Sequence, residues 1–200
     1  MSDNINPAIF LYHGFCEGPY ISQHFVQSLI SAGFQTVEDP EQADILIGHS
    51  GGCFQIPTTS HARLVVYVGY PWWPGRSLIN ALYRKNRREH AVSRRKGTTR
   101  QWWKKFLWNS IYFWNMSRNF SMWQAMKRGP EALRYSRVLC IRNKDDDCCT
   151  SAIWKVPELK QCAFLSARGE HDHLWVHPDV YAVMIKAYYG AIILAQTETK

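Results

Sequence analysis

Residues 44–52 read Asp44-Ile45-Leu46-Ile47-Gly48-His49-Ser50-Gly51-Gly52. The short apolar run at 45–47 predicts a buried strand, and the serine that follows it lies in the pattern Gly-x-Ser-x-Gly. A serine that attacks a substrate must project from a sharp turn between a strand and a helix. Gly48 and Gly52 have no Cβ, so the backbone can pass close to Ser50 without a clash. The pattern therefore predicts a nucleophile elbow; the alternative is a Gly/Ser-rich loop that only turns a corner.

The rest of the chain alternates predicted strands with predicted helices. Further strands are expected at 8–12, 34–38, 63–69, 136–142 and 161–167. Helices are expected at 20–33, 51–59, 77–90, 151–159 and 178–195, with one turn at 39–43 and a long helical stretch beginning near residue 100. The apolar side of the last helix is expected to hold Val180, Val183, Met184, Ala187, Tyr188, Ile192 and Ile193. This alternation favours an α/β fold, with a mainly parallel sheet of about six strands covered by helices on both faces.

Length and composition fit one globular domain, which we expect to span residues 1–200. The chain has 200 residues, and 46% of them are hydrophobic. No apolar run is long enough to cross a bilayer, and the polar stretch at 1–7 does not resemble a signal peptide. We therefore expect a cytoplasmic protein. The six cysteines, which form neither a C-x-x-C pair nor a regular framework, are expected to be reduced thiols without a metal: Cys16, Cys53, Cys140, Cys148, Cys149 and Cys162.

Three loops that carry candidate catalytic side chains follow predicted strands. Ser50 follows the strand at 44–48, an acidic run at 145–147 follows the strand at 136–142, and His171 follows the strand at 161–167. The acidic run offers three carboxylates, those of Asp145, Asp146 and Asp147. Because open α/β sheets place their sites at the carboxyl ends of the strands, we expect these loops to converge.

The chain order serine, acid, histidine is that of the α/β-hydrolase superfamily, which this sequence resembles from Ala8 to the C-terminal helix. The motifs that carry the resemblance are Gly48-His49-Ser50-Gly51-Gly52, His13-Gly14-Phe15, Asn143-Lys144-Asp145-Asp146 and Gly169-Glu170-His171-Asp172-His173-Leu174. Asn143 stands where the family has a glycine. The first two strands of the family are missing, so the resemblance implies a compact member with six strands.

The resemblance implies a catalytic triad. Ser50 would be the nucleophile, His171 its general base, and a buried carboxylate would orient the imidazole. Asp146 fits the loop spacing best, and its two acidic neighbours are the alternatives. The backbone N–H groups of Phe15 and Gly51 would form the oxyanion hole.

Other histidines are close enough in sequence to compete for the catalytic role. His173 and His177 are each more simply explained as exposed polar residues on a loop, and His171 directly follows the Gly-Glu pair at the end of the strand. His49, beside Ser50, is expected to be structural, either orienting the turn or packing against its neighbours.

Most of the excess positive charge lies in one segment. The net charge is +8, and ten of the 24 basic residues fall at 84–105. Five tryptophans follow between Trp102 and Trp123, and Trp72 and Trp73 precede them. In the family, 70–130 is where a lid is usually inserted, so we expect a helical lid whose aromatic residues pack on the domain or line an acyl pocket. Basic residues beside aromatic ones also suit peripheral contact with an anionic membrane. Nucleic acid is not expected as a partner, because no nucleic-acid-binding motif accompanies the charge.

These features predict a serine hydrolase that cleaves a carboxylic ester, or a related acyl bond of a small-molecule substrate, through an acyl-enzyme on Ser50. The chemistry requires no metal or organic cofactor. The alternative is a catalytically idle hydrolase-like binding module that contacts anionic lipid, nucleic acid or protein through 84–123. An acyltransferase or thioesterase would use the same residues. The oligomeric state stays open.

Overall fold

The structure is a computed structural model that describes residues 6–14, 19–57, 61–70, 107, 111, 137–146, 162–171 and 173–197. Nearly all of the segment 70–130, and the helix expected at 151–159, lie outside the described residues. The division into one domain with a lid insertion therefore stays a prediction.

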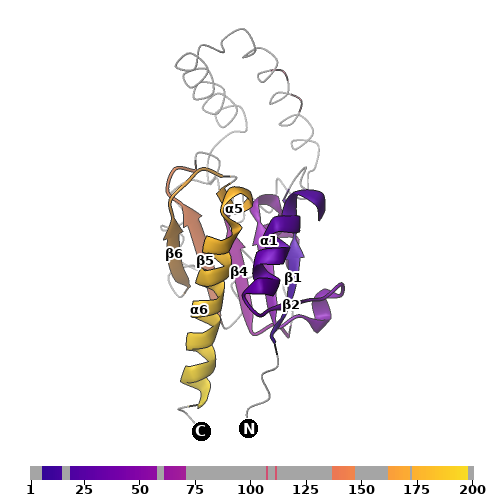
Figure 1. Cartoon of the computed structure of the whole chain (residues 1–200), viewed down its shortest axis with the longest axis vertical. Coiled ribbons are helices and arrows are strands. Elements are labelled where there is room, and N and C mark those ends of the chain that lie inside the picture. Colours follow the sequence, from indigo (N-terminus) through magenta and orange to yellow (C-terminus); the bar gives the residue numbers. More distant parts are fainter. Residues whose placement is uncertain are drawn as a thin grey trace.

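The core of the molecule is a six-stranded sheet in which every strand pair is parallel, in the order β2-β1-β3-β4-β5-β6 (Figure 1). The strands are β1 (Ala8–Tyr12), β2 (Gln35–Thr36), β3 (Ile45–His49), β4 (Leu64–Val68), β5 (Val138–Asn143) and β6 (Ala163–Ala167). The predicted parallel α/β sheet of six strands is confirmed. β2 is shorter than expected, covering two of the five residues predicted.

The two central strands are buried along their whole length. All residues of β3 and β4 are buried, and alternate side chains enter different hydrophobic clusters. Ile47 and Val66 contribute to the cluster beneath the helices, whereas Leu46 and Val65 contribute to the cluster that also holds Ile56. This explains why both strands read as continuous apolar runs, as is typical of parallel strands covered on both faces.

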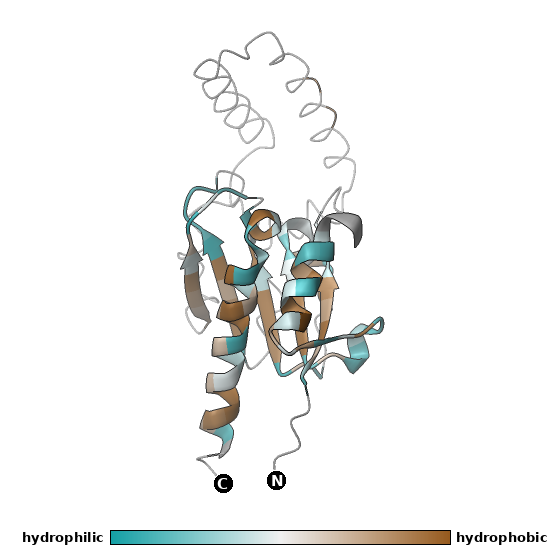
Figure 2. Cartoon of the chain, viewed as in Figure 1, coloured by the Kyte–Doolittle hydropathy of each residue, from teal (hydrophilic) through white to brown (hydrophobic). Residues whose placement is uncertain are grey.

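Three helices lie on one face of the sheet: α1 (Pro19–Ser31), α5 (His173–Val176) and α6 (Pro178–Thr197) (Figure 1). Two short 3-10 helices complete the described elements, η1 (Pro40–Gln42) and η2 (Ser50–Phe54). Figure 2 shows the strands of the core in brown, and the loops that follow β5 and β6 mainly in teal. The polar loops thus cluster at the carboxyl ends of the strands. No helix among the described residues is long and apolar enough to cross a membrane.

Two helices differ from their predicted form. The helix expected at 51–59 is the short η2, because a proline at 57 disfavours helical geometry at the residue before it. In α6 the buried residues include Tyr181, Ala182 and Ile185, whereas Val183 is 64% exposed. The predicted apolar side of α6 is therefore correct at Val180, Met184, Tyr188 and Ile192, which lie in or against the core, and wrong in that it left out Tyr181, Ala182 and Ile185.

Candidate active site

Ser50 is the first residue of η2 and occupies a strained turn directly after β3. Its φ angle is +51°, and no other non-glycine residue in the described part of the chain has a positive φ. An L-residue pays for this conformation with crowding between Cβ and the backbone, typically about 1–3 kcal/mol, and such strain concentrates at functional sites. The backbone at Ser50 is thus held in a conformation that its own side chain disfavours.

The glycines on either side of Ser50 are sterically required. A Cβ on Gly48 would lie 2.7 Å from the Cα of Cys53, and a Cβ on Gly52 would lie 2.2 Å from the carbonyl oxygen of Tyr12. The thiol of Cys53 also donates a hydrogen bond to the carbonyl of Gly48, at 3.1 Å. The turn is therefore packed against the end of β1, and the hydrogen bond from Cys53 to Gly48 joins its two ends.

His171 and Asp146 form a hydrogen-bonded pair beside this turn. The imidazole Nδ1 lies 2.8 Å from Oδ2 of Asp146, and the side chains are 16% and 0% exposed, respectively. A carboxylate only accepts, so the neutral imidazole must carry its proton on Nδ1, and Nε2 is then an acceptor. This is the tautomer that a general base for a serine requires.

The pair packs directly on the backbone that follows β4. A Cβ on Gly69, whose φ is +57°, would lie 3.4 Å from Nδ1 of His171 and 3.5 Å from Oδ2 of Asp146. Sheet register explains the meeting: His49 at the end of β3 pairs with Val68, and β5 and β6 end at the same edge. The ring centroids of His49 and His171 are 5.0 Å apart. Ser50, Asp146 and His171 therefore lie at one edge of the sheet.

The neighbouring acidic residues are placed differently. Oδ2 of Asp145 accepts a hydrogen bond from the backbone N–H of Gly169 at 3.2 Å, which ties the loop after β5 to the loop after β6. Asp147 lies outside the described residues. Of the two described carboxylates, the structure pairs that of Asp146 with His171.

The remaining histidines near the site have structural surroundings. His49 is fully buried, its Nε2 lies 3.3 Å from the carbonyl oxygen of His171, and its ring packs edge-on against Trp175 at 4.9 Å. His173 was expected on an exposed loop, and this is wrong: it is half-buried in α5 and its Nδ1 lies 3.0 Å from the hydroxyl of Tyr181. His177 is exposed, as expected.

Two residues with no role predicted from the sequence complete the site. Asn143 is fully buried, and its side-chain amide donates hydrogen bonds to the carbonyls of Glu170 (2.9 Å) and His171 (3.3 Å). The hydroxyl of Tyr181 donates to Oδ1 of Asn143. Burial raises the pKa of Tyr181 well above its usual value, so the phenol stays protonated and can donate. The available signal for Asn143 was a polar amide that ends a strand beginning with four apolar residues.

The candidate oxyanion hole is described only in part. Gly51 is buried in the first turn of η2, and Phe15 lies outside the described residues. Within the described ranges, no group of three or more His, Cys, Asp or Glu side chains is arranged to hold a metal ion. Cys53, Cys140 and Cys162 are thiols that form no disulfide; the other three cysteines are not described.

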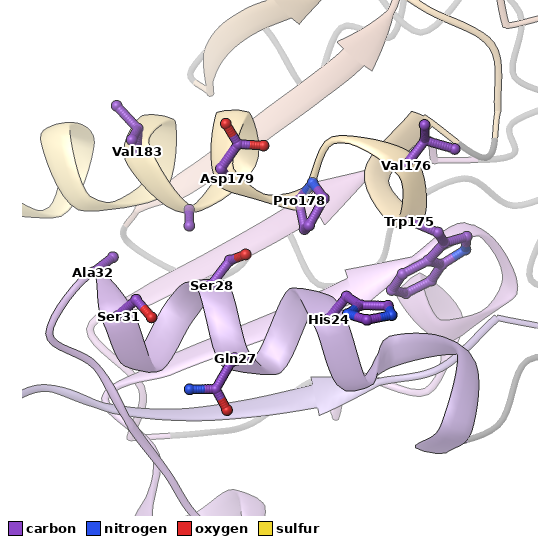
Figure 3. A pocket seen from close by; sticks show the side chains of 11 residues that line it. His24, Gln27, Ser28, Ser31, Ala32, Trp175, Val176, Pro178, Asp179 and Val183 are labelled. Atoms are coloured by element: carbon purple, nitrogen blue, oxygen red, sulfur yellow. The ribbon is translucent and has the colours of Figure 1, made fainter.

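A separate groove of about 670 Å³ lies between α1 and α6 (Figure 3). It is lined by His24, Gln27, Ser28, Ser31 and Ala32 of α1 and by Trp175, Val176, Pro178, Asp179, Ala182 and Val183. None of the three candidate catalytic residues lines this groove. Trp175 forms its end nearest the site, since the same ring packs against His49.

Comparison with known proteins identifies the fold. No family model matches the chain, and no curated protein sequence matches it. Solved structures do. A membrane phospholipase A, described as a bacterial virulence factor, aligns with a TM-score of 0.60 at 14% identity, over 94% of this chain and 79% of that chain.

Two further matches are of similar quality. The 2-hydroxy-6-oxo-6-phenylhexa-2,4-dienoate hydrolase of Rhodococcus sp. strain RHA1 aligns with a TM-score of 0.58 at 14% identity, over 94% of this chain and 92% of that chain. A monoacylglycerol lipase of Paleococcus ferrophilus aligns with a TM-score of 0.52 at 14% identity, over 92% and 95% of the two chains. Together with the six parallel strands and the order of their loops, these matches show that the chain has the α/β-hydrolase fold.

Proposed function

We propose that this chain is a serine hydrolase that cleaves a carboxylic ester, or a related acyl bond, through an acyl-enzyme on Ser50. The observation that carries the proposal is the buried pairing of Asp146 with His171 at 2.8 Å, at the edge of the sheet where a strained turn presents Ser50. A protein gains no stability from a serine held at a positive φ, whereas a nucleophile needs that projection.

The reaction follows from the roles of these groups. The Ser50 hydroxyl attacks the carbonyl carbon of the substrate, and its proton passes to Nε2 of His171. The tetrahedral intermediate expels the alcohol, which takes the proton from His171, and leaves the acyl group on Ser50. A water molecule then attacks the acyl carbon by the same route and frees the acid. Asp146 stabilises the positive imidazolium in both halves.

Backbone N–H groups would stabilise the negative oxygen of the intermediate. The N–H of Gly51, directly after the nucleophile, is the first proposed donor, and the N–H of Phe15 is the second. Each such donor is typically worth about 3 kcal/mol of transition-state stabilisation. These groups and water are sufficient for the reaction.

We further propose that the acyl substrate is apolar and that the basic, tryptophan-rich part of 70–130 contacts an anionic membrane from the cytoplasmic side. Basic and aromatic residues side by side are the usual composition of an interfacial segment. The matches to a membrane phospholipase A and a monoacylglycerol lipase are consistent with an ester substrate, although at 14% identity they support the fold alone.

The second candidate function is an idle hydrolase-like binding module acting through 84–123. The ten clustered basic residues favour it. The paired Asp146 and His171 disfavour it, because binding of an anion does not need a histidine oriented for proton transfer.

Labelling with a fluorophosphonate tests the proposal, because this reagent reports an activated serine whatever the natural acyl group is. A serine hydrolase should be labelled rapidly as the wild type, and the Ser50→Ala and His171→Ala variants should not be labelled. Ser28→Ala on α1 and His177→Ala after α5 are the matched controls and should label like the wild type. A folded wild type that does not label, but binds anionic vesicles or nucleic acid, would favour the binding module instead.

A further inference from the structure

The loop that carries His171 is held from two strands at once. The carbonyl oxygen of His171 lies 3.3 Å from Nε2 of His49, at the end of β3. The same oxygen lies 3.3 Å from the side-chain amide of Asn143, at the end of β5. Both donors are fully buried. β4 runs between these strands, and a Cβ on Gly69 after it would lie 3.4 Å from the imidazole. The backbone of His171 is therefore fixed from both sides while its ring is fixed by Asp146.

The orientation of the Asn143 amide is itself determined. The Tyr181 hydroxyl has one proton and gives it to Oδ1 of Asn143, so the nitrogen of the amide must face the carbonyls of Glu170 and His171. Because that proton is committed, Nδ1 of His173 is the donor to the Tyr181 oxygen. The hydrogen-bond network thus runs from α6 through β5 to the loop that carries His171, and the donor and acceptor of each bond are assigned.

The proton of His49 is assigned by the same argument. Its ring packs edge-on against Trp175 of α5, with centroids 4.9 Å apart, and Nε2 must carry the proton because the His171 carbonyl can only accept. A fully buried donor is expensive to separate from its acceptor, because it would lose its partner without gaining water.

We propose that His49 and Asn143 are positioning residues that hold the His171 backbone as a clamp, and that Tyr181 sets the clamp by orienting Asn143. The inference rests on the proposed function and goes beyond it, because it assigns roles to residues outside the triad. A displacement of about 1 Å in a catalytic group can lower a rate by about 100-fold, so loss of one clamp contact should slow the chemical step. It should leave substrate binding unchanged, since both side chains bond to the backbone carbonyl of His171.

A pair of substitutions at position 49 isolates the hydrogen bond. His49→Phe keeps an aromatic ring against Trp175 and removes the donor. His49→Gln restores an N–H the same number of bonds from the backbone. His61→Phe, at an exposed histidine before β4, is the matched control. Tyr181→Phe removes the hydroxyl that orients Asn143, and Tyr188→Phe on the same helix is its control.

Two measurements are made on each variant. The first is hydrogen–deuterium exchange of the peptide that spans 166–174, which needs no activity. The second is inactivation by a fluorophosphonate over a range of concentrations, which separates the maximal rate, kinact, from the concentration term, KI.

The clamp predicts faster exchange confined to that peptide in His49→Phe and Tyr181→Phe, with kinact lowered by about tenfold and KI unchanged. His49→Gln should recover both values toward the wild type, and the two controls should not change. Unaltered exchange and kinact in His49→Phe and Tyr181→Phe would overturn the inference, as would equal losses in His49→Phe and His49→Gln. A wild type that fails to react would refute the proposed function alone, because the exchange comparison would still decide whether the clamp exists.

Discussion

Replacing Gly52 by alanine should damage both the fold and the reactivity of this protein. The added Cβ would lie 2.2 Å from the carbonyl oxygen of Tyr12 and 2.7 Å from that of His13. A carbon and a carbonyl oxygen in contact normally stay about 3.3 Å apart or more, so the turn and the end of β1 must separate by roughly 1 Å. Both partners are backbone atoms, so no side-chain rotation can relieve the clash.

The expected magnitude follows from that separation. Overpacking of a well-packed site typically costs about 1–3 kcal/mol, and a shift of about 1 Å at a nucleophile typically costs about 100-fold in rate. Gly52→Ala should therefore unfold at a lower urea concentration with an unchanged m-value. Its fluorophosphonate inactivation should slow by about two orders of magnitude.

Gly190→Ala provides the matched control on the same chain. Nothing lies within 4 Å of a Cβ at Gly190, which is inside α6. The alanine should stabilise the protein by about 0.5–1 kcal/mol, because glycine is disfavoured in a helix interior. A Gly52→Ala protein with wild-type stability and wild-type reactivity would refute the close packing of the turn described above.

Three further predictions concern the loops around the site. Asp146→Asn should keep the fold, as judged by circular dichroism, and should slow fluorophosphonate labelling by about 10⁴-fold, because the imidazole would adopt the wrong tautomer; Asp145→Asn is the comparison and should label much faster. Gly169→Ala should destabilise the protein by about 1–3 kcal/mol in urea titrations, because its Cβ would lie 2.2 Å from Cδ2 of His173 and the φ there is +134°. Burial and the nearby His177 lower the pKa of His173, whereas the charges of Asp145 and Asp179 act to raise it. The lowering effects are larger, so the folded protein favours the neutral ring. The contribution of neutral His173 to stability is present above its pKa in the unfolded chain, about 6.5, and is lost as pH falls through the pKa in the folded protein. The free energy of unfolding should therefore decline less between about pH 7.5 and about pH 5 in His173→Asn than in the wild type.

The strands could be predicted from sequence because burial on both faces leaves an unmistakable signal. β1 and β4 appear as short apolar runs bounded by turn residues, and both were predicted to within one residue at each end. The six-stranded parallel sheet, and with it the α/β-hydrolase fold, is confirmed for the same reason. The strained conformation of Ser50 was foreseeable because only glycines fit on either side of it.

Other features depend on contacts that no local pattern encodes. The buried side of α6 is set by where the helix lies on the sheet. Tyr181 is buried on that side, and its hydroxyl donates a hydrogen bond to Asn143. The choice between adjacent carboxylates depends on the turn after β5, in which the N–H of Asp146 bonds back to the carbonyl of Asn143. Spacing alone treats Asp145 and Asp146 alike.

The proposed function depends on the activation of Ser50 as a nucleophile by His171. The most direct measurement is peptide mapping by mass spectrometry of the wild-type protein after reaction with a fluorophosphonate. The proposed function predicts one adduct per chain, carried by Ser50, and no adduct in the His171→Ala protein. An adduct on another residue, or a folded wild type with no adduct, would contradict it.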